Sequence, residues 1–197
     1  MLEELIQIDK ELFLYLNHLG TPFWDSFWTY LSRIISFITV PLYLVVVLYS
    51  YQVFGLKKTA IILGMLIILI TCTEQLSIAF KHGIGRLRPC YNDEVKEIMR
   101  MVKSYCGGKF GYFSAHAANS SAFACFFGTL FMKYNKWVVF ILACWALLVG
   151  YSRIYLGVHF PLDVITGIGF GVLFGGAFGY LFLKLQRKRT EEKVNGC

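Results

Sequence analysis

Three short polar segments interrupt an otherwise apolar chain, and their side chains are those that can bind and react with a phosphate. The segments are Lys81–Pro89, Ser114–His116 and Ser152–Asp163. Arginine and lysine can hold a tetrahedral anion, and a histidine supported by a carboxylate can attack phosphorus. Charged residues near bilayer depth are costly, so these are candidate functional residues.

Each of these side chains has a candidate role in phosphoryl transfer, which needs positive charge around the oxygens, a nucleophile and a proton donor. His159, oriented by Asp163, is the candidate nucleophile, and His116 is the candidate acid for the departing oxygen. The residues expected to hold the phosphate are Lys81, Arg88, Ser114, Ala115 through its backbone amide, and Arg153. No carboxylate cluster suited to magnesium accompanies them, so we expect no metal or other cofactor.

Taken singly, each residue also has a structural explanation. A lone arginine at a helix end usually anchors the helix at the membrane interface, and Lys81 alone would be a snorkelling residue. A lone histidine is more often a hydrogen-bonded residue at a helix end than a catalytic residue. The joint occurrence of the three segments favours a functional role for these candidate residues. His18 and His82 are not among them and are expected to be structural. Arg86 either belongs to the site or faces lipid headgroups.

The composition indicates an integral membrane protein. Of the 197 residues, 57% are hydrophobic and 16% are charged, and so much apolar surface requires lipid. The net charge of +7 is divided among short loops between apolar runs, which is a membrane-orientation signal and not a nucleic-acid signal. The acidic start lacks the basic leader of a cleavable signal peptide, so the first membrane helix is expected to target the protein.

Five apolar runs are each near the ~20 residues that cross ~30 Å of hydrocarbon. They are residues 34–53, 59–80, 114–132, 137–156 and 162–183. Before them, residues 1–33 form an amphipathic and interfacial segment, with an apolar helix face made by Leu5, Ile8, Leu12 and Leu16. This helix is expected to lie at the membrane surface, or to be a sixth, partly embedded helix.

The predicted fold is therefore all-α: a polytopic membrane bundle of five or six transmembrane helices in a single domain, 1–197. Its transmembrane core is 34–183, followed by a cytoplasmic basic tail, 184–197. Short basic loops predict the orientation, because Lys57, Lys58, Lys133, Lys136 and the tail share one side, which should be cytoplasmic. The 81–113 segment and the turn at 157–161 then face outward. We expect a bacterial inner-membrane protein whose active site faces the periplasm.

Two of the six cysteines lie in the polar segment between the second and third apolar runs. If this segment faces an oxidising compartment, Cys90 and Cys106 can pair, closing a loop worth about 3 kcal/mol on the chain-entropy model. Unpaired loop thiols are the alternative. The sequence contains no Cys/His spacing typical of a metal site.

The last apolar run carries a glycine at every fourth position. Such a stripe permits close approach of two helices, and Pro161 is well placed to open this helix. The glycines are Gly167, Gly171, Gly175 and Gly179.

The three polar segments resemble the signature of the type 2 phosphatidic acid phosphatases, membrane lipid phosphate phosphatases related to the vanadium haloperoxidases. That signature reads K-x6-RP, PSGH and SR-x5-H-x3-D, and the similarity spans about residues 55–185. The resemblance implies a phosphohistidine on His159 assisted by Asp163, proton donation by His116, and phosphate binding by the remaining motif residues. The second motif departs from the family, since Phe113 and Ala115 lack proline's fixed φ and glycine's access to positive φ.

The sequence thus predicts a lipid phosphatase, with undecaprenyl diphosphate as the first expected substrate and lipid A phosphate next. Phosphatidylglycerol phosphate and phosphatidic acid follow. A lipid phosphotransferase is a related alternative. A non-catalytic transporter or scaffold is the alternative of another class, although a transporter would more often show internal repeats and broken helices. The expected partners are the lipid substrate and the bilayer, with no nucleic acid.

Overall fold

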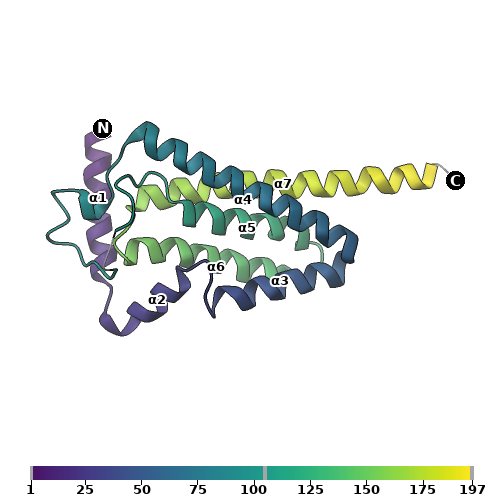
Figure 1. Cartoon of the computed structure of the whole chain (residues 1–197), viewed down its shortest axis with the longest axis horizontal. Coiled ribbons are helices and arrows are strands. Elements are labelled where there is room, and N and C mark those ends of the chain that lie inside the picture. The colour runs from purple at the N-terminus through teal and green to yellow at the C-terminus, as the bar shows by residue number, and fades with distance from the viewer. Residues whose placement is uncertain (1, 104–105, 196–197) are drawn as a thin grey trace.

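The fold is built from helices, and the computed structural model describes residues 2–103 and 106–195 (Figure 1). The elements are α1 (Leu2–His18), η1 (Pro22–Trp24), α2 (Asp25–Leu31), α3 (Thr39–Phe54), α4 (Leu56–Ile84), η2 (Pro89–Tyr91), α5 (Ala115–Phe131), α6 (Lys136–Tyr155) and α7 (Pro161–Asn195). Within the described ranges the extended structure is limited to one isolated bridge, Leu87 to Phe110.

Helices α3 to α7 run along the long axis of the molecule, and α1 lies across one end (Figure 1). By length and composition, α4, α6 and α7 up to Lys188 can each cross a bilayer, and α3 is a shorter apolar helix of 16 residues. The prediction of an all-α membrane bundle is confirmed. Because α1 is transverse to the five long helices, it is not a sixth member of the bundle.

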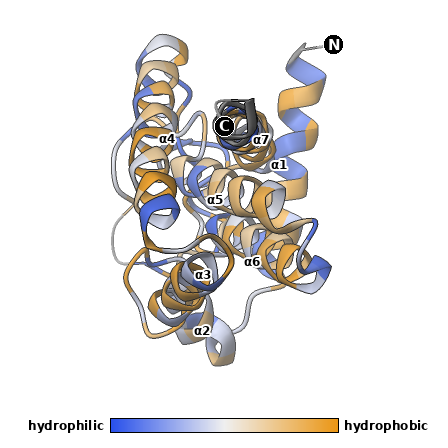
Figure 2. Cartoon of the chain, turned by 90° about the vertical axis from the view of Figure 1, so that its right-hand side faces the viewer, coloured by the Kyte–Doolittle hydropathy of each residue, from blue (hydrophilic) through white to orange (hydrophobic). Residues whose placement is uncertain are grey.

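Helix α5 lies between α4, α6 and α7 (Figure 2). Of its 17 residues 13 are buried. Most of its surface therefore contacts other helices, and few large apolar side chains are needed to face lipid. This position explains why the third predicted span contains so many alanines and serines.

The glycine stripe of α7 faces α5. A Cβ atom added at Gly167 would lie 2.6 Å from the carbonyl oxygen of Ser114, and one at Gly179 would lie 2.7 Å from Cβ of Thr129. Gly171 and Gly175 face the carbonyl oxygens of Ala118 and Ala122 in the same way. The stripe therefore has the packing role that the sequence predicted, because only glycine allows this approach.

The first predicted span is wrong at its start, since α3 begins at Thr39 and not at residue 34. Side-chain hydroxyls hold the preceding residues in a turn. The Ser36 hydroxyl accepts from the amides of Ile38 and Thr39, and the Thr39 hydroxyl donates to the carbonyl of Ile34 at 2.8 Å. Such local bonds compete with the helical ones.

The residues of the predicted basic tail continue the last helix, because α7 runs without interruption from Pro161 to Asn195. Residues 184–195 contain no glycine or proline, and lysine, arginine and glutamate favour helix. Residues 196 and 197 of the predicted tail lie outside the described residues. Pro161 opens the helix, as predicted.

Helix α1 packs through a face other than its apolar one. Leu5, Ile8 and Leu12 are exposed, whereas Phe13 and two polar residues, Asp9 and Asn17, are buried against the bundle. The exposed leucine and isoleucine side chains suit contact with lipid, which agrees with a helix lying at the membrane surface.

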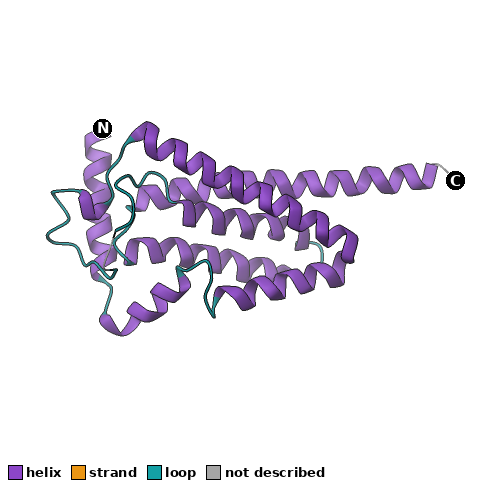
Figure 3. Cartoon of the chain, viewed as in Figure 1, coloured by secondary structure: helices purple, strands orange, loops and turns teal. Residues whose placement is uncertain are grey.

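The two ends of the bundle differ in character. The long connection between α4 and α5 gathers at the same end as α1 (Figure 3). The short connections α3–α4 and α5–α6 lie at the opposite end, and Lys57, Lys58, Lys133 and Lys136 are in or beside them.

Candidate active site

The three polar segments meet at the loop-rich end of the bundle, because antiparallel helices bring their termini there. Lys81 is in the last turn of α4, His116 in the first turn of α5, Arg153 in the last turn of α6, and Asp163 in the first turn of α7. Arg88 comes from the connection that follows α4.

His159 and Asp163 form a buried pair. Nδ1 of His159 lies 3.4 Å from Oδ2 of Asp163, and the side chains are 3% and 0% exposed. The same Oδ2 accepts a hydrogen bond from the amide of Phe160 at 3.0 Å, which fixes the carboxylate beside the ring. A ring held through Nδ1 has Nε2 left for chemistry.

Burial lowers the pKa of His159 well below its usual value, and the charges of Arg88, Arg153 and Lys81 lower it further. A hydrogen bond with the backbone of Gly111 acts in the opposite direction. At neutral pH the ring is therefore uncharged and carries a free lone pair, which is the form that can attack phosphorus.

The second segment is tied directly to the third. The amide of Ser114 donates to the carbonyl of Asp163 at 2.9 Å, and the Ser114 hydroxyl caps α5 by accepting from the amide of Ala117 at 3.4 Å. Ala115 is the first residue of α5, and the positive φ values among described residues are all at glycines. The missing family glycine is therefore no obstacle to this geometry.

Arg88 is held by the loop that follows it. Its Nε donates to the carbonyl of Phe110, and its Nη1 to the carbonyl of Cys106, each at 3.2 Å. Cys106 is joined to Cys90 by a disulfide, with Cα atoms 6.3 Å apart. Burial lowers the pKa of Arg88 from its usual value, but the guanidinium stays charged at any physiological pH.

Arg153 is buried at 5% exposure and its backbone positions the third segment. Its carbonyl accepts from the amides of Val158 and His159, which folds the turn between α6 and α7 back on α6. Its Nη1 also donates to the hydroxyl of Ser32, in the loop before α3.

Electrostatic interactions connect all three segments. His116 interacts with Arg153, His159 and Lys81, and Lys81 interacts with Arg88, Arg153 and Asp163. The structure thus brings together the charged and histidine side chains that the sequence proposed for phosphate binding and catalysis, whereas the Ser114 hydroxyl caps its own helix. A phosphate placed among them would meet several cations and a neutral histidine.

Sequence reasoning missed Lys103 and Arg33, two further cations beside this cluster. Burial lowers the pKa of Lys103 to about 8, and the charges of Arg153, Arg33 and Arg88 contribute. Neither residue belongs to a motif with characteristic spacing, and both reach the site through loops. No sequence signal would have found them.

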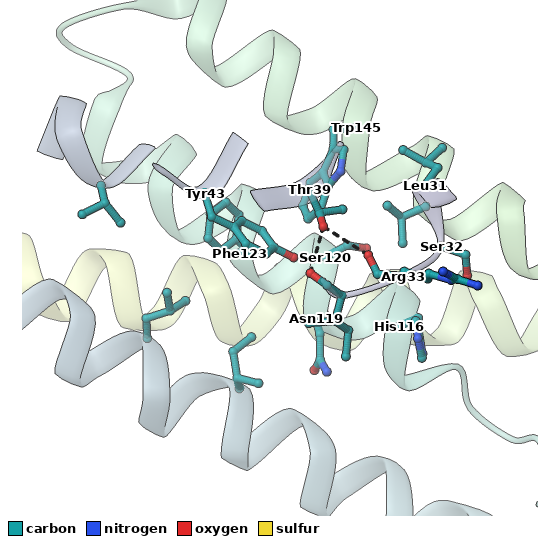
Figure 4. A pocket seen from close by; sticks show the side chains of 15 residues that line it. Leu31, Ser32, Arg33, Thr39, Tyr43, His116, Asn119, Ser120, Phe123 and Trp145 are labelled. Carbon is teal, nitrogen blue, oxygen red and sulfur yellow. Dashed lines mark hydrogen bonds between the residues drawn. The ribbon is translucent and has the colours of Figure 1, made fainter. Parts of the chain in front are cut away.

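An apolar cavity of about 320 Å³ adjoins the site (Figure 4). His116, Arg33 and Ser32 line it toward the cationic cluster, and Phe123 and Trp145 are among its apolar lining residues. The cavity therefore joins an anion-binding region to a volume suited to hydrocarbon.

The sequence reasoning also missed a polar contact within the bundle. Nδ2 of Asn119, at the cavity edge, donates to Oε1 of Glu74 at 2.6 Å, and Oδ1 accepts from the Thr73 hydroxyl at 2.6 Å. Glu74 is an acidic residue within an apolar run, and this feature of the sequence could have identified it as a candidate for a polar contact inside the bundle.

The apolar bundle and its cationic, histidine-containing end are those of an integral-membrane phosphatase. The sequence pattern of the PAP2 superfamily matches residues 58–191, and the chain belongs to this family. This assignment confirms the resemblance predicted from the three segments, and it argues against the transporter and scaffold alternatives.

Comparison with individual proteins gives the same assignment. The chain is 33% identical over 192 residues to a lipid A 4'-phosphatase of Bacteroides thetaiotaomicron, covering 96% of this chain and 82% of that protein. It is 30% identical to a lipid A 4'-phosphatase of Porphyromonas gingivalis, covering 88% and 72%. The fold resembles the crystal structure of a PAP2-type phosphatidylglycerolphosphate phosphatase from Bacillus subtilis, with a TM-score of 0.68 at 21% identity and coverage of 94% and 87%.

Proposed function

We propose that this membrane phosphatase removes a phosphate group from lipid A, at the outer face of a bacterial inner membrane. The observation that carries the proposal is that the cationic cluster around His159 adjoins an apolar cavity, so one site can hold both a phosphate and hydrocarbon. Lipid A is preferred to undecaprenyl diphosphate, the first expectation from the sequence. The two lipid A 4'-phosphatases match this chain over most of both lengths.

The proposed reaction has two steps. Nε2 of His159 attacks the phosphorus atom, an N–P bond forms, and the P–O bond to the lipid breaks. His116 gives a proton to the departing lipid oxygen, while Lys81, Arg88 and Arg153 offset the charge on the phosphate oxygens. In the second step water attacks the phosphohistidine while His116 takes a proton from the water. The N–P bond breaks, inorganic phosphate leaves, and the imidazole of His159 and the protonated His116 are restored.

Metal-independent chemistry is part of this proposal. Among the side chains that the structure describes, His, Cys, Asp and Glu form no group of three or more able to hold a metal ion. The cations of the site already supply the positive charge that a metal would otherwise provide.

The outward orientation is supported by the distribution of basic residues. The connections at the end opposite the site carry Lys57, Lys58, Lys133 and Lys136, and cytoplasmic loops are enriched in such residues. The site would then face the periplasm.

The test is phosphate release from a substrate panel by the purified full-length chain in detergent, with a metal chelator present. The panel contains lipid A, undecaprenyl diphosphate, phosphatidylglycerol phosphate and phosphatidic acid. The proposal expects the highest kcat/KM with lipid A. A higher value with undecaprenyl diphosphate would restore the earlier expectation, and loss of all activity on chelation would refute the metal-independent reaction.

A further inference from the structure

Helix α1 buries a carboxylate beside the catalytic end of the bundle. Asp9 is 3% exposed, and its Oδ1 accepts a hydrogen bond from the amide of Leu162, in the first turn of α7, at 2.8 Å. A buried carboxylate is costly unless it is paired. A helix that only lies on a membrane surface has no need for one at this position.

The partner of Asp9 is Arg86, which connects it to the candidate catalytic pair. Nη2 of Arg86 lies 2.5 Å from Oδ2 of Asp9, and Nη1 lies 2.8 Å from Oδ1 of Asp163. The two terminal nitrogens of one planar guanidinium therefore hold two carboxylates from different helices.

An aromatic contact fixes the guanidinium between them. Cζ of Arg86 lies 4.5 Å from the ring centroid of Phe160, within the range of a cation–π interaction. The ring of Phe160 in turn packs against Phe13 of α1, with centroids 5.2 Å apart. Arg86 is thus confined by α1 on one side and by the start of α7 on the other.

This arrangement determines how the Asp163 carboxylate is turned. Arg86 occupies Oδ1, and Oδ2 is left to accept from the amide of Phe160 and to face Nδ1 of His159. Without Arg86 the carboxylate would lose the bond that opposes its rotation. The imidazole would then lose the partner that sets its tautomer and stabilises the charge that develops as it reacts.

We propose that Asp9 and Arg86 are positioning residues for catalysis: Arg86 orients Asp163 toward His159, and Asp9 holds both Arg86 and the first turn of α7. Helix α1 is then part of the catalytic apparatus as well as a surface helix. The inference rests on the proposed function, because Asp163 acts through His159.

The test uses four single variants and one double variant of the full-length chain. Arg86→Gln removes the charge, and Arg86→Lys keeps it but replaces two bonded nitrogens by one. Asp9→Asn keeps an acceptor for the amide of Leu162 but loses the charge that Arg86 contacts. Lys10→Gln is the matched control, since Lys10 lies on α1 and pairs with Glu94 at 2.7 Å without touching the network.

The expected effect is on kcat. A carboxylate displaced by nearly 1 Å lowers the rate by about 10–100-fold, so Asp9→Asn, Arg86→Gln and Arg86→Lys should all fall in this range while Lys10→Gln stays at the wild-type value. KM should change by less than about twofold, since Arg88, Arg153 and Lys81 bind the phosphate. Arg86→Gln combined with Asp9→Asn should be no slower than Arg86→Gln alone.

Several outcomes would overturn the inference. Variants with the kcat of Lys10→Gln would show that the network does not act on catalysis, and additive effects in the double variant would show that Asp9 does not act through Arg86. If the loss of kcat matches the fraction of the variant that is unfolded, and disappears when the assay is run well below the unfolding temperature, the residues have a structural role only. A wild-type chain inactive on every lipid phosphate would instead refute the proposed function.

Discussion

Gly167 offers a sharp test of how helix packing sets the catalytic geometry. Its position on α7 faces the start of α5, where an added Cβ would meet the carbonyl oxygen of Ser114 at 2.6 Å and Cβ of Ala117 at 3.2 Å. A carbon and a carbonyl oxygen in favourable contact lie about 3.3–3.6 Å apart. Gly167→Ala must therefore move the two backbones apart by roughly 0.7 Å or more at this point.

The displacement acts on a bond inside the active site. The amide of Ser114 donates to the carbonyl of Asp163 at 2.9 Å, four residues before Gly167 on α7. Separation of the helices lengthens this bond and moves His116 relative to His159. A shift approaching 1 Å lowers kcat by about 100-fold. The crowding also costs about 1–3 kcal/mol of stability, offset by the roughly 1 kcal/mol that alanine adds in a helix.

The matched control is Gly169→Ala, two residues further along the same helix, where an added Cβ meets no atom within 4 Å. The control should keep the wild-type kcat and gain up to about 1 kcal/mol from helix propensity. Phosphate release and thermal unfolding in detergent measure both effects. A Gly167→Ala protein with the kcat of Gly169→Ala would refute the coupling of helix approach to site geometry.

Two further predictions concern residues outside the motifs. Lys103, whose pKa is lowered to about 8, carries its positive charge below that pH and loses it above, so KM should rise as the pH passes about 8. Lys103→Met should have the raised KM already at about pH 7, and its KM should not rise further near pH 8. If KM changes with pH in the same way in both proteins, the charge of Lys103 does not contribute to substrate binding. Asn17→Ala removes Nδ2, which donates to the carbonyls of Arg100, Ile154 and Tyr155, and should lower the free energy of unfolding by about 2–3 kcal/mol. An unchanged unfolding temperature would contradict that value.

The sequence was most informative where charged or histidine side chains lie at the ends of predicted helices. Charged and histidine residues at the borders of apolar runs predicted the side chains that the structure brings together, because antiparallel helices return alternate ends to one side. Apolar length likewise predicted α4, α6 and the course of α7. The glycine stripe of α7 predicted its close contact with α5, since few other roles require a glycine at every fourth position.

What the sequence did not predict depends on specific hydrogen bonds. The start of α3 is delayed by the hydroxyls of Ser36 and Thr39, which no hydropathy average detects. Asp9 and Arg86 are 77 residues apart, and nothing in either local sequence indicates their pairing. The apolar pattern of α1 predicted a face for the membrane surface, but it did not indicate that the face packed on the protein carries Asp9.

A phosphohistidine trapped during turnover would identify His159 as the nucleophile. Lipid A labelled with ³²P at its scissile phosphate is mixed with enzyme, the reaction is stopped within one turnover, and the labelled peptide is identified by mass spectrometry. The label should be acid-labile and stable to base, should lie on His159, and should be absent from His159→Ala, which should release no phosphate. Turnover by His159→Ala, or a label on any other residue, would contradict the assignment of His159 as the nucleophile.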